Sequence, residues 1–232
     1  MSEEQERIAR AFHGYAGSHA AEGRWSPLNR GNRRVVEERM AATRRLLESH
    51  GPSNLHATRV LEVGCGTGGE LARLTEMGAD PANLVGVDLV EDRVETGRSR
   101  FPDLDLRVMN AEQLRFADGE FEVVMAITVF SSILDDAMAR RVAAEITRVI
   151  KPGGWLLWYD FRYRNPRNPD VRAVTEADVR RLFPSLRGHL QAITLVPPLA
   201  RRLGPLTPVL YPVLSAVPRL RTHLLGLLRK PA

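Results

Sequence analysis

Short apolar runs alternate with segments of helical periodicity through the middle of the chain. The apolar runs predict strands at residues 59–63, 84–88, 104–110, 121–128 and 155–160. Apolar residues that recur every three or four positions predict helices between these strands, at residues 69–77, 91–100 and 135–150. Such alternation favours an α/β fold whose doubly wound, mostly parallel sheet has helices on both faces. In that fold, ligands bind at the carboxyl ends of the strands, near the switch in strand order.

The two ends of the chain lack this alternation. Residues 1–50 predict helices at 3–12 and 33–49 joined by a polar stretch, and we expect them to form an N-terminal helical lid over the neighbouring domain, residues 51–195. Residues 196–232 are rich in Leu, Pro and Arg. Because proline interrupts helices, this last segment is expected to be a helical C-terminal appendage made of short pieces.

Charge is distributed unevenly over the 232 residues, whose formal net charge is +5. Residues 1–150 contain 19 basic and 24 acidic residues, a net of −5, whereas residues 151–232 contain 14 and 4, a net of +10. A basic, apolar tail suits three roles: a cap that holds an anionic or apolar substrate, an element at a membrane surface, or a helical face packed on the sheet or on a second subunit of a homodimer. Arginines on a solvated face explain the charge without any partner.

Three further features bear on compartment and metal binding. Cys65 is the only cysteine, which excludes an internal disulfide. The first residues are acidic and polar, and no run of about eighteen apolar residues occurs, so neither a signal peptide nor a membrane span is predicted and a cytoplasmic location is expected. Asp135 and Asp136 are adjacent acids at a predicted helix start, where they favour the helix dipole, and we expect no metal.

The most informative segment is the glycine-rich turn after the first predicted strand, Leu61-Glu62-Val63-Gly64-Cys65-Gly66-Thr67-Gly68-Gly69. Asp88 ends the next predicted strand. Glycines admit a ligand close to the backbone, and an acid at a strand tip can accept hydrogen bonds from a ribose diol. The spacing fits a dinucleotide loop and an S-adenosylmethionine (SAM) loop alike. Glu62 favours SAM, because a carboxylate suits a cationic ligand and disfavours a pyrophosphate.

Four segments, in order across residues 58–160, give the chain a more specific resemblance. They are residues 61–68, 86–88, 110–124 and 146–154, the last of which ends in an expected turn, Lys151-Pro152-Gly153-Gly154. The set is similar to class I SAM-dependent methyltransferases of the small-molecule and ubiquinone type. The resemblance implies a Rossmann-like, SAM-binding domain at residues 51–195, with SAM as the cofactor.

The resemblance also implies which residues contact SAM. The glycine loop should line its methionine and ribose, Asp88 should hold the ribose hydroxyls, and Leu89 should pack on the adenine. Asn110 stands where the family usually has Asp, and its side-chain oxygen can still accept a hydrogen bond from the adenine amino group. The full set of expected cofactor contacts is Glu62, Gly64, Cys65, Gly66, Gly68, Asp88, Leu89, Asn110, Ala111, Glu112 and Ile127.

The class of acceptor is inferred from the loop after the fourth predicted strand, Ile127-Thr128-Val129-Phe130-Ser131-Ser132. Enzymes that methylate the amino groups of nucleic-acid bases usually have Asn/Asp-Pro-Pro-Tyr/Phe at this point. The loop therefore argues against a nucleic-acid substrate and favours a small molecule, methylated at a hydroxyl oxygen in a natural-product or glycan pathway. RNA methylation, suggested by the basic tail alone, and SAM binding without turnover are the alternatives.

A general base is useful when the methyl acceptor is a hydroxyl, although positioning alone accelerates an in-line displacement strongly. Many small-molecule relatives have a pair of histidines after the fourth strand, where this chain has Ser131 and Ser132. The candidate catalytic residues therefore lie elsewhere: His13, Tyr15 and His19 in the predicted lid, and Asp160 at the end of a predicted strand.

Overall fold

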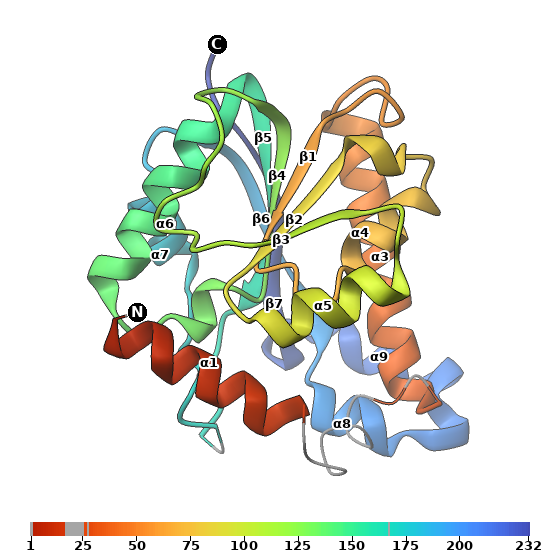
Figure 1. Cartoon of the computed structure of the whole chain (residues 1–232). Coiled ribbons are helices and arrows are strands. Elements are labelled where there is room, and N and C mark those ends of the chain that lie inside the picture. The colour runs from red at the N-terminus through yellow and green to blue at the C-terminus, as the bar shows by residue number, and fades with distance from the viewer. Residues whose placement is uncertain (1, 17–25, 27, 167) are drawn as a thin grey trace.

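A seven-stranded sheet forms the centre of the computed structural model, which describes residues 2–16, 26, 28–166 and 168–232 (Figure 1). The strands are β1 Val60–Val63, β2 Leu84–Asp88, β3 Asp105–Val108, β4 Phe121–Ile127, β5 Ile150–Phe161, β6 Arg187–Leu195 and β7 Arg221–Arg229. Their order in the sheet is β3-β2-β1-β4-β5-β7-β6. The first five strands are parallel to one another, and β7 runs antiparallel to both of its neighbours.

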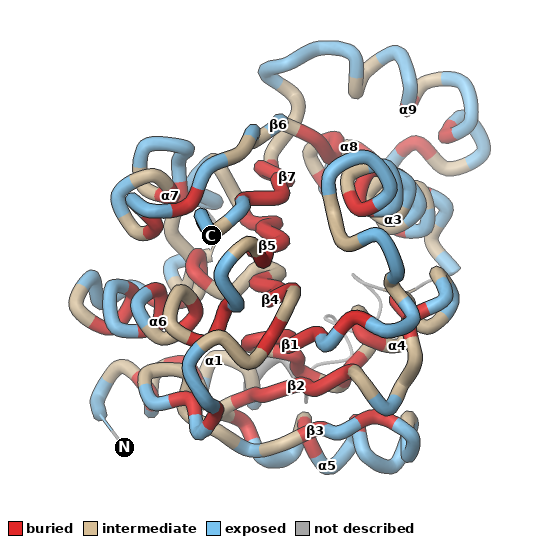
Figure 2. The backbone as a smooth tube through the Cα atoms, turned by 90° about the horizontal axis from the view of Figure 1, so that it is seen from above, coloured by how far each residue is buried: buried red, intermediate tan, exposed pale blue. Residues whose placement is uncertain are grey.

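Helices cover both faces of this sheet (Figure 2). They are α1 Glu3–Ala16, α3 Arg30–His50, α4 Gly69–Thr75, α5 Glu91–Arg100, α6 Asp136–Val149, α7 Glu176–Leu182, α8 Pro197–Arg202 and α9 Thr207–Ser215, with short 3₁₀ turns at Pro81–Asn83, Phe130–Ser132, Gly204–Leu206 and Pro218–Leu220. Val142 of α6 and Val179 of α7 belong to the core on one face, and Leu71 of α4 and Val94 of α5 to the core on the other. Because both faces are covered, the central strands are apolar without alternation.

The predicted α/β fold with a mostly parallel, Rossmann-like sheet is confirmed. All four residues of β1 and all five of β2 are buried, as the apolar runs indicate. The helical periodicity of the central segments is confirmed as well: in α6, Val142, Ile146 and Val149 are all buried. Asp135 caps this helix, its side chain accepting a hydrogen bond from the backbone of Met138, which satisfies one of the free amides of the first turn.

Two predicted elements differ from the structure. Residues 196–220 contain the short helices that were expected, but residues 221–229 form β7 rather than a helix. Leucine is a strong helix former, and only the pairing with β5 and β6 on either side decides for the strand. Gly226 permits this pairing, because a Cβ there would lie 2.6 Å from the His189 carbonyl oxygen. Residues 151–154, expected to be a turn, belong to an irregular beginning of β5.

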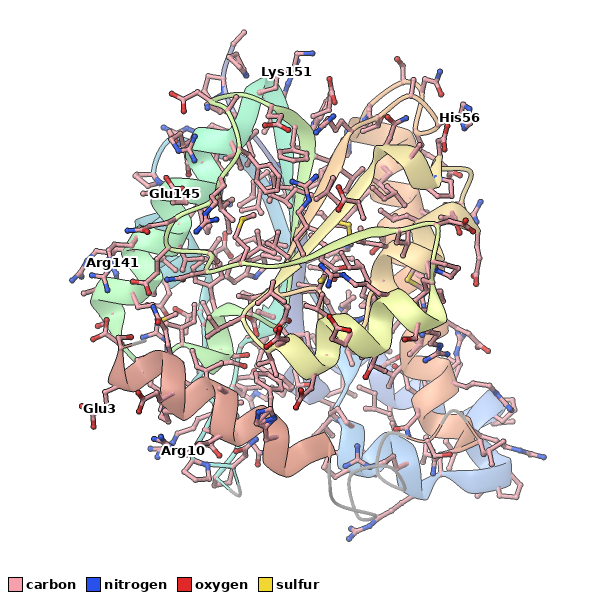
Figure 3. All side chains as sticks on the ribbon, viewed as in Figure 1. Glu3, Arg10, His56, Arg141, Glu145 and Lys151 are labelled. Atoms are coloured by element: carbon pink, nitrogen blue, oxygen red, sulfur yellow. The ribbon has the colours of Figure 1, made fainter. Side chains whose placement is uncertain are left out.

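The first helix, α1, lies across the end of the sheet at which the parallel strands end (Figure 1). Glu3 and Arg10 point from it into solvent (Figure 3), whereas Ile8 joins the core. Side chains of α1 fix its position: Arg7 donates to the Ser132 carbonyl at 2.5 Å, and Glu4 accepts from the Leu134 amide at 2.6 Å. The next helix, α3, packs on a face of the sheet instead.

Candidate active site

The glycine loop between β1 and α4 is held against the tip of β2. The amides of Gly64 and Cys65 both donate to the carbonyl oxygen of Val87, at 2.8 and 3.0 Å. Gly64 has a φ of +71° and Gly66 a φ of +54°, values that glycine adopts with little strain. A Cβ on Gly64 would lie 2.7 Å from a methyl group of Val129, so the loop also needs glycine for space. The loop therefore presents bare backbone to the carboxyl end of the sheet.

Asp88, at the tip of β2, organises this loop. Its carboxylate accepts hydrogen bonds from the Gly66 amide at 2.8 Å and from the Val90 amide at 2.9 Å. The guanidinium of Arg93 lies 3.6 Å from the same carboxylate, and the Asp88 side chain is only 6% exposed. A carboxylate has about four lone-pair positions, so Asp88 keeps capacity for a ligand diol beside these two bonds.

Two pockets meet at the glycine loop, and Gly64, Arg93 and Thr128 line both of them. The smaller pocket, about 80 Å³, is mainly apolar and has Ile8, Phe12, Val63, Val87, Leu89, Met109, Val129, Ile133, Met138 and Val142 in its wall, with Asp88, Asn110, Ala111 and Ser132. The larger pocket, about 470 Å³, is mainly polar. Its lining includes Glu62, Cys65 and Ile127, together with Arg39 and Glu70. The size and mixed lining are those of a small-molecule site.

Glu62 is a buried acid in the wall of the polar pocket, with 2% of the residue exposed. Its Oε2 atom is fully buried and has no hydrogen-bond partner within the described part of the chain. Burial raises the pKa of Glu62 well above its usual range, the neighbouring carboxylate of Glu70 adds to this, and Arg39 opposes it. An unpaired buried carboxylate is costly, and a cationic group placed against it would relieve that cost.

On the apolar side, four of the predicted contacts are arranged as one surface. Leu89, Asn110 and Ala111 line the apolar pocket together with Asp88. The Asn110 side-chain oxygen accepts a hydrogen bond from the Glu112 amide at 2.9 Å, which fixes the turn after β3 and leaves one lone pair of that oxygen for a ligand.

Glu112 itself turns away from the pocket. Its carboxylate accepts from Gln5 of α1 at 2.6 Å and from Arg141 of α6 at 2.6 Å. Partial burial would raise the pKa of Glu112, but these hydrogen bonds outweigh it and lower the pKa. In this arrangement Glu112 holds α1 in place, and direct contact with the cofactor stays a prediction.

Comparison with known proteins supports the assignment of this region. The sequence model of the family described as "Methyltransferase domain" matches residues 60–154. The chain is 37% identical over 113 residues to phthiotriol/phenolphthiotriol dimycocerosates methyltransferase 1 of Mycobacterium ulcerans, which covers 48% of this chain and 40% of the relative. It is 30% identical over 128 residues to demethylmenaquinone methyltransferase of Renibacterium salmoninarum, which covers 55% of this chain and 51% of the relative.

The chain contains a class I SAM-dependent methyltransferase domain. A crystal structure of a SAM-dependent methyltransferase from Thermotoga maritima shares the fold over 97% of this chain and 99% of that one, with a TM-score of 0.60 and 16% identity. The chain spans about half or less of the length of the two curated relatives that it matches. SAM is the cofactor of this methyltransferase family, as the four sequence segments predicted.

The residues present fit SAM. Glu62, whose buried Oε2 has no hydrogen-bond partner in the described part of the chain, lines the polar pocket, where a positively charged amino-acid end would find a counter-charge. The bare backbone of Gly64 leaves space that a side chain would fill, and the apolar pocket beside Leu89 suits an adenine ring. Because the two pockets share Gly64, Arg93 and Thr128, one ligand can extend from the apolar pocket into the polar one.

The predicted catalytic residues are not gathered at one point. Asp160, near the end of β5, is buried and lines neither pocket. It accepts hydrogen bonds from the amides of Ser131 and Phe161, at 3.0 and 2.8 Å. Burial raises the pKa of Asp160 to about 6, against the effect of the Ser131 hydrogen bonds. In this position Asp160 anchors the loop after β4, and a direct part in catalysis stays a prediction.

The other three candidates belong to the N-terminal segment. His13 lies on α1 beside Phe12, and its Nδ1 atom is 3.6 Å from a carboxylate oxygen of Asp92 on α5. Tyr15 lies on the same helix, and its side chain is outside the described part of the structure, as is the whole of His19. An acid beside an imidazole can orient it as a general base. The catalytic role of His13 stays a prediction.

Two residues at the centre of the site were not singled out from the sequence. The guanidinium of Arg93 lies 4.5 Å from the ring centroid of Phe12 and against Gly66, and Arg93 lines both pockets. Thr128 has a φ of +55°, which is uncommon for a residue other than glycine, and its amide donates to Tyr159 at 2.7 Å. Strained backbone of this kind gathers at functional sites. The position of Arg93 after a strand-tip acid is a weak sequence signal. Thr128 belongs to the loop that the sequence places at the strand ends, but the sequence does not indicate its positive φ.

Proposed function

We propose that the protein transfers the methyl group of SAM to a hydroxyl oxygen of a small, lipophilic acceptor. The relatives named above are methyltransferases of phthiotriol-type lipids and of a menaquinone precursor, and these acceptors are lipophilic small molecules. A natural-product or glycan pathway remains our proposal for its setting. Contact with a membrane and a homodimer, both suggested by the basic tail, are proposals as well.

Each part of the cleft has a defined task in this reaction. Asp88 holds a ribose, Leu89 and Ala111 flank an adenine, and Glu62 balances the charge of an amino-acid end. Bound SAM supplies a methyl group on a sulfonium that is open to attack by a nucleophile. The main contribution of the chain is to hold that group and the acceptor oxygen in line, because positioning supplies a large share of such a barrier, about 7–11 kcal/mol.

The observation that favours a small molecule over a nucleic acid is the position of Phe130. In enzymes that methylate nucleic-acid bases, an aromatic residue at the end of this loop stacks on the flipped base. Phe130 has no exposed surface here, and its ring packs against Trp158 and Phe183, with ring centroids 5.1 and 5.6 Å apart. It therefore has no face available for a base. RNA methylation is left with only the positive charge of the tail to support it.

Binding and turnover test separate parts of the proposal. Isothermal titration of the full chain with SAM and with S-adenosylhomocysteine measures cofactor binding. An Asp88→Asn variant should bind both ligands at least about ten-fold more weakly, because a charged hydrogen-bond partner of the ribose is lost. Asp103→Asn changes an exposed residue near β3 in the same way and should leave binding unchanged.

Transfer is measured with SAM labelled in the methyl group and a panel of lipophilic alcohols, diols and quinols. Label that partitions into organic solvent supports the proposed acceptor class. Label recovered only in RNA would replace it with the RNA alternative. Tight SAM binding with no transfer to any acceptor would favour a binding protein without turnover.

A further inference from the structure

Helix α9 is apolar on two opposite sides. Its inner side packs on the rest of the chain: Tyr211 is 1% exposed and forms a small core with Leu195, Ala200 and Leu203. On its outer side, Leu206, Val209, Val213 and Val217 are 59, 66, 63 and 45% exposed. Val209 and Val213 lie one turn apart on α9, and Leu206 and Val217 flank the helix just before and just after it. We call these four residues the α9 face.

The segment that forms the α9 face is apolar and contains no acid of its own. Four prolines, at positions 205, 208, 212 and 218, are exposed beside it. Isolated apolar residues on a surface need no explanation, but a contiguous apolar patch marks a binding surface. No Asp or Glu occurs between Ser185 and the end of the sequence, while seven Arg and Lys do, so the charges that this segment itself contributes are of one sign.

Two arginines stand at the ends of the α9 face. Arg202, before it, and Arg219, after it, are both exposed. Over the described ranges, 2–16, 26, 28–166 and 168–232, neither forms an ion pair. An apolar stripe flanked by unpaired guanidinium groups matches the chemistry of an anionic bilayer surface, where apolar side chains enter the acyl boundary and arginines contact phosphates.

The α9 face also lies at the end of the molecule that carries the site. Strand β6 runs parallel to β5, because both are antiparallel to β7. Residues 196–220, which follow β6, therefore lie beyond the same edge of the sheet as the glycine loop and the tip of β2. Figure 1 shows α1, α8 and α9 together at this end. The α9 face is therefore at the end of the sheet that carries the cleft, toward the β6 side (Figure 2).

We propose that the α9 face docks the protein on an anionic lipid bilayer, with α9 lying along the interface. None of the helices in the described part of the chain combines the length and hydropathy that a membrane span requires, so the contact is peripheral. A second copy fits less well. An isologous dimer would place the same patch on itself and bring the arginines at its ends, Arg202 and Arg219, toward one another, which like charges oppose. The proposal does not depend on methyl transfer.

Sedimentation with lipid vesicles tests this docking. The full chain should bind vesicles of phosphatidylcholine with phosphatidylglycerol much more strongly than vesicles of phosphatidylcholine alone, and added salt should weaken the binding. An Arg202→Ala and Arg219→Ala double variant should lose about 25-fold in partition coefficient, since each basic residue contributes about five-fold at such a surface.

Val209→Asp with Val213→Asp should reduce the partition coefficient by at least about ten-fold, because apolar burial in the interface is lost. Leu134→Asp is the control. Leu134 lies just before α6 and is 37% exposed, and this change should have little effect on the partition coefficient. Thermal unfolding followed by circular dichroism shows that each variant is folded.

No binding to anionic vesicles, or binding that the α9 variants leave unchanged, would overturn the proposal. A dimer in solution that the same variants dissociate would show instead that the α9 face is a subunit interface.

Discussion

The hydroxyl of Tyr211 in α9 donates a hydrogen bond of 2.7 Å to the Glu38 carboxylate in α3. The Thr194 amide of β6 donates to the same carboxylate oxygen at 3.0 Å. One acid of α3 therefore joins the C-terminal helices to the sheet. The next residue of α3, Arg39, contacts Glu70 at 2.6 Å and lines the polar pocket, so the same helix also contributes to the cofactor site.

Tyr211→Phe should lower the free energy of unfolding by about 1–3 kcal/mol, because the ring stays in place while a hydrogen bond to a charged group is lost. Urea unfolding measures the change. Tyr163→Phe alters a tyrosine that is 40% exposed and should change stability by less than about 0.5 kcal/mol. Equal effects of the two substitutions would show that the Glu38 hydrogen bond contributes nothing.

A pair of glycine substitutions separates backbone strain from ligand contact. Gly66→Ala and Gly204→Ala each place a Cβ on left-handed backbone, with φ of +54° and +49°, and each should destabilise the fold by about 1–2 kcal/mol. A Cβ at Gly66 would collide with the Arg93 guanidinium at the junction of the two pockets, whereas nothing lies within 4 Å of one at Gly204. Titration with SAM should therefore show weaker binding, by at least about ten-fold, for Gly66→Ala alone. Similar losses in both variants would mean that the effect is one of folding.

Glu62→Gln removes the negative charge that we propose to balance the positive charge at the amino-acid end of SAM. The dissociation constant for SAM should rise about ten- to a hundred-fold, as for the loss of a charged hydrogen bond. The comparison ligand is 5′-methylthioadenosine, which has the adenosine and the sulfur but no amino acid. The unmodified protein and the Glu62→Gln variant should bind 5′-methylthioadenosine with the same affinity. If both ligands lose affinity equally, Glu62 supports the loop instead of contacting the ligand.

Asp160→Asn should change how stability depends on pH. The pKa of Asp160 is raised to about 6 in the folded protein, whereas an unfolded Asp titrates near about 3.9. The native protein therefore keeps a proton that the unfolded chain loses, and its stability falls as pH rises between these two values. Relative to Asp160→Asn, the unmodified protein should lose about 2 kcal/mol from about pH 4 to about pH 7. Urea unfolding at both pH values gives this difference, and a constant difference would contradict the raised pKa.

Sequence features that are local along the chain were predictable. The parallel strands, the glycine loop and Asp88 follow from short patterns, because strand ends and the turns after them bring neighbouring residues to one edge of the sheet. The family segments added SAM, which the glycine spacing alone did not distinguish from a dinucleotide. The identity of the acceptor and the roles of His13, Tyr15 and His19 stay predictions.

What could not be predicted depends on contacts between distant segments. Glu38 and Tyr211 are 173 positions apart, and nothing in the sequence indicates their hydrogen bond. The leucine-rich run at residues 221–229 is compatible with a helix until two neighbouring strands are in place. Asp160 was expected at the site because its strand ends there, but its side chain turns into the core toward the Ser131 amide. Side-chain direction at a strand end was the missing information.

The position of β7 has a consequence for synthesis. Within the residues that the structure describes, strand β6 is at the edge of the sheet and pairs only with β7, which is made after it. While a nascent chain lengthens, β6 has no place in the sheet, and β5 presents an open edge to other strands until β7 has been made. Correct assembly therefore waits for the residues up to Arg229. Loss of a few of these residues, by a premature stop codon or a protease, would deprive two strands of their pairing and leave an edge prone to aggregation.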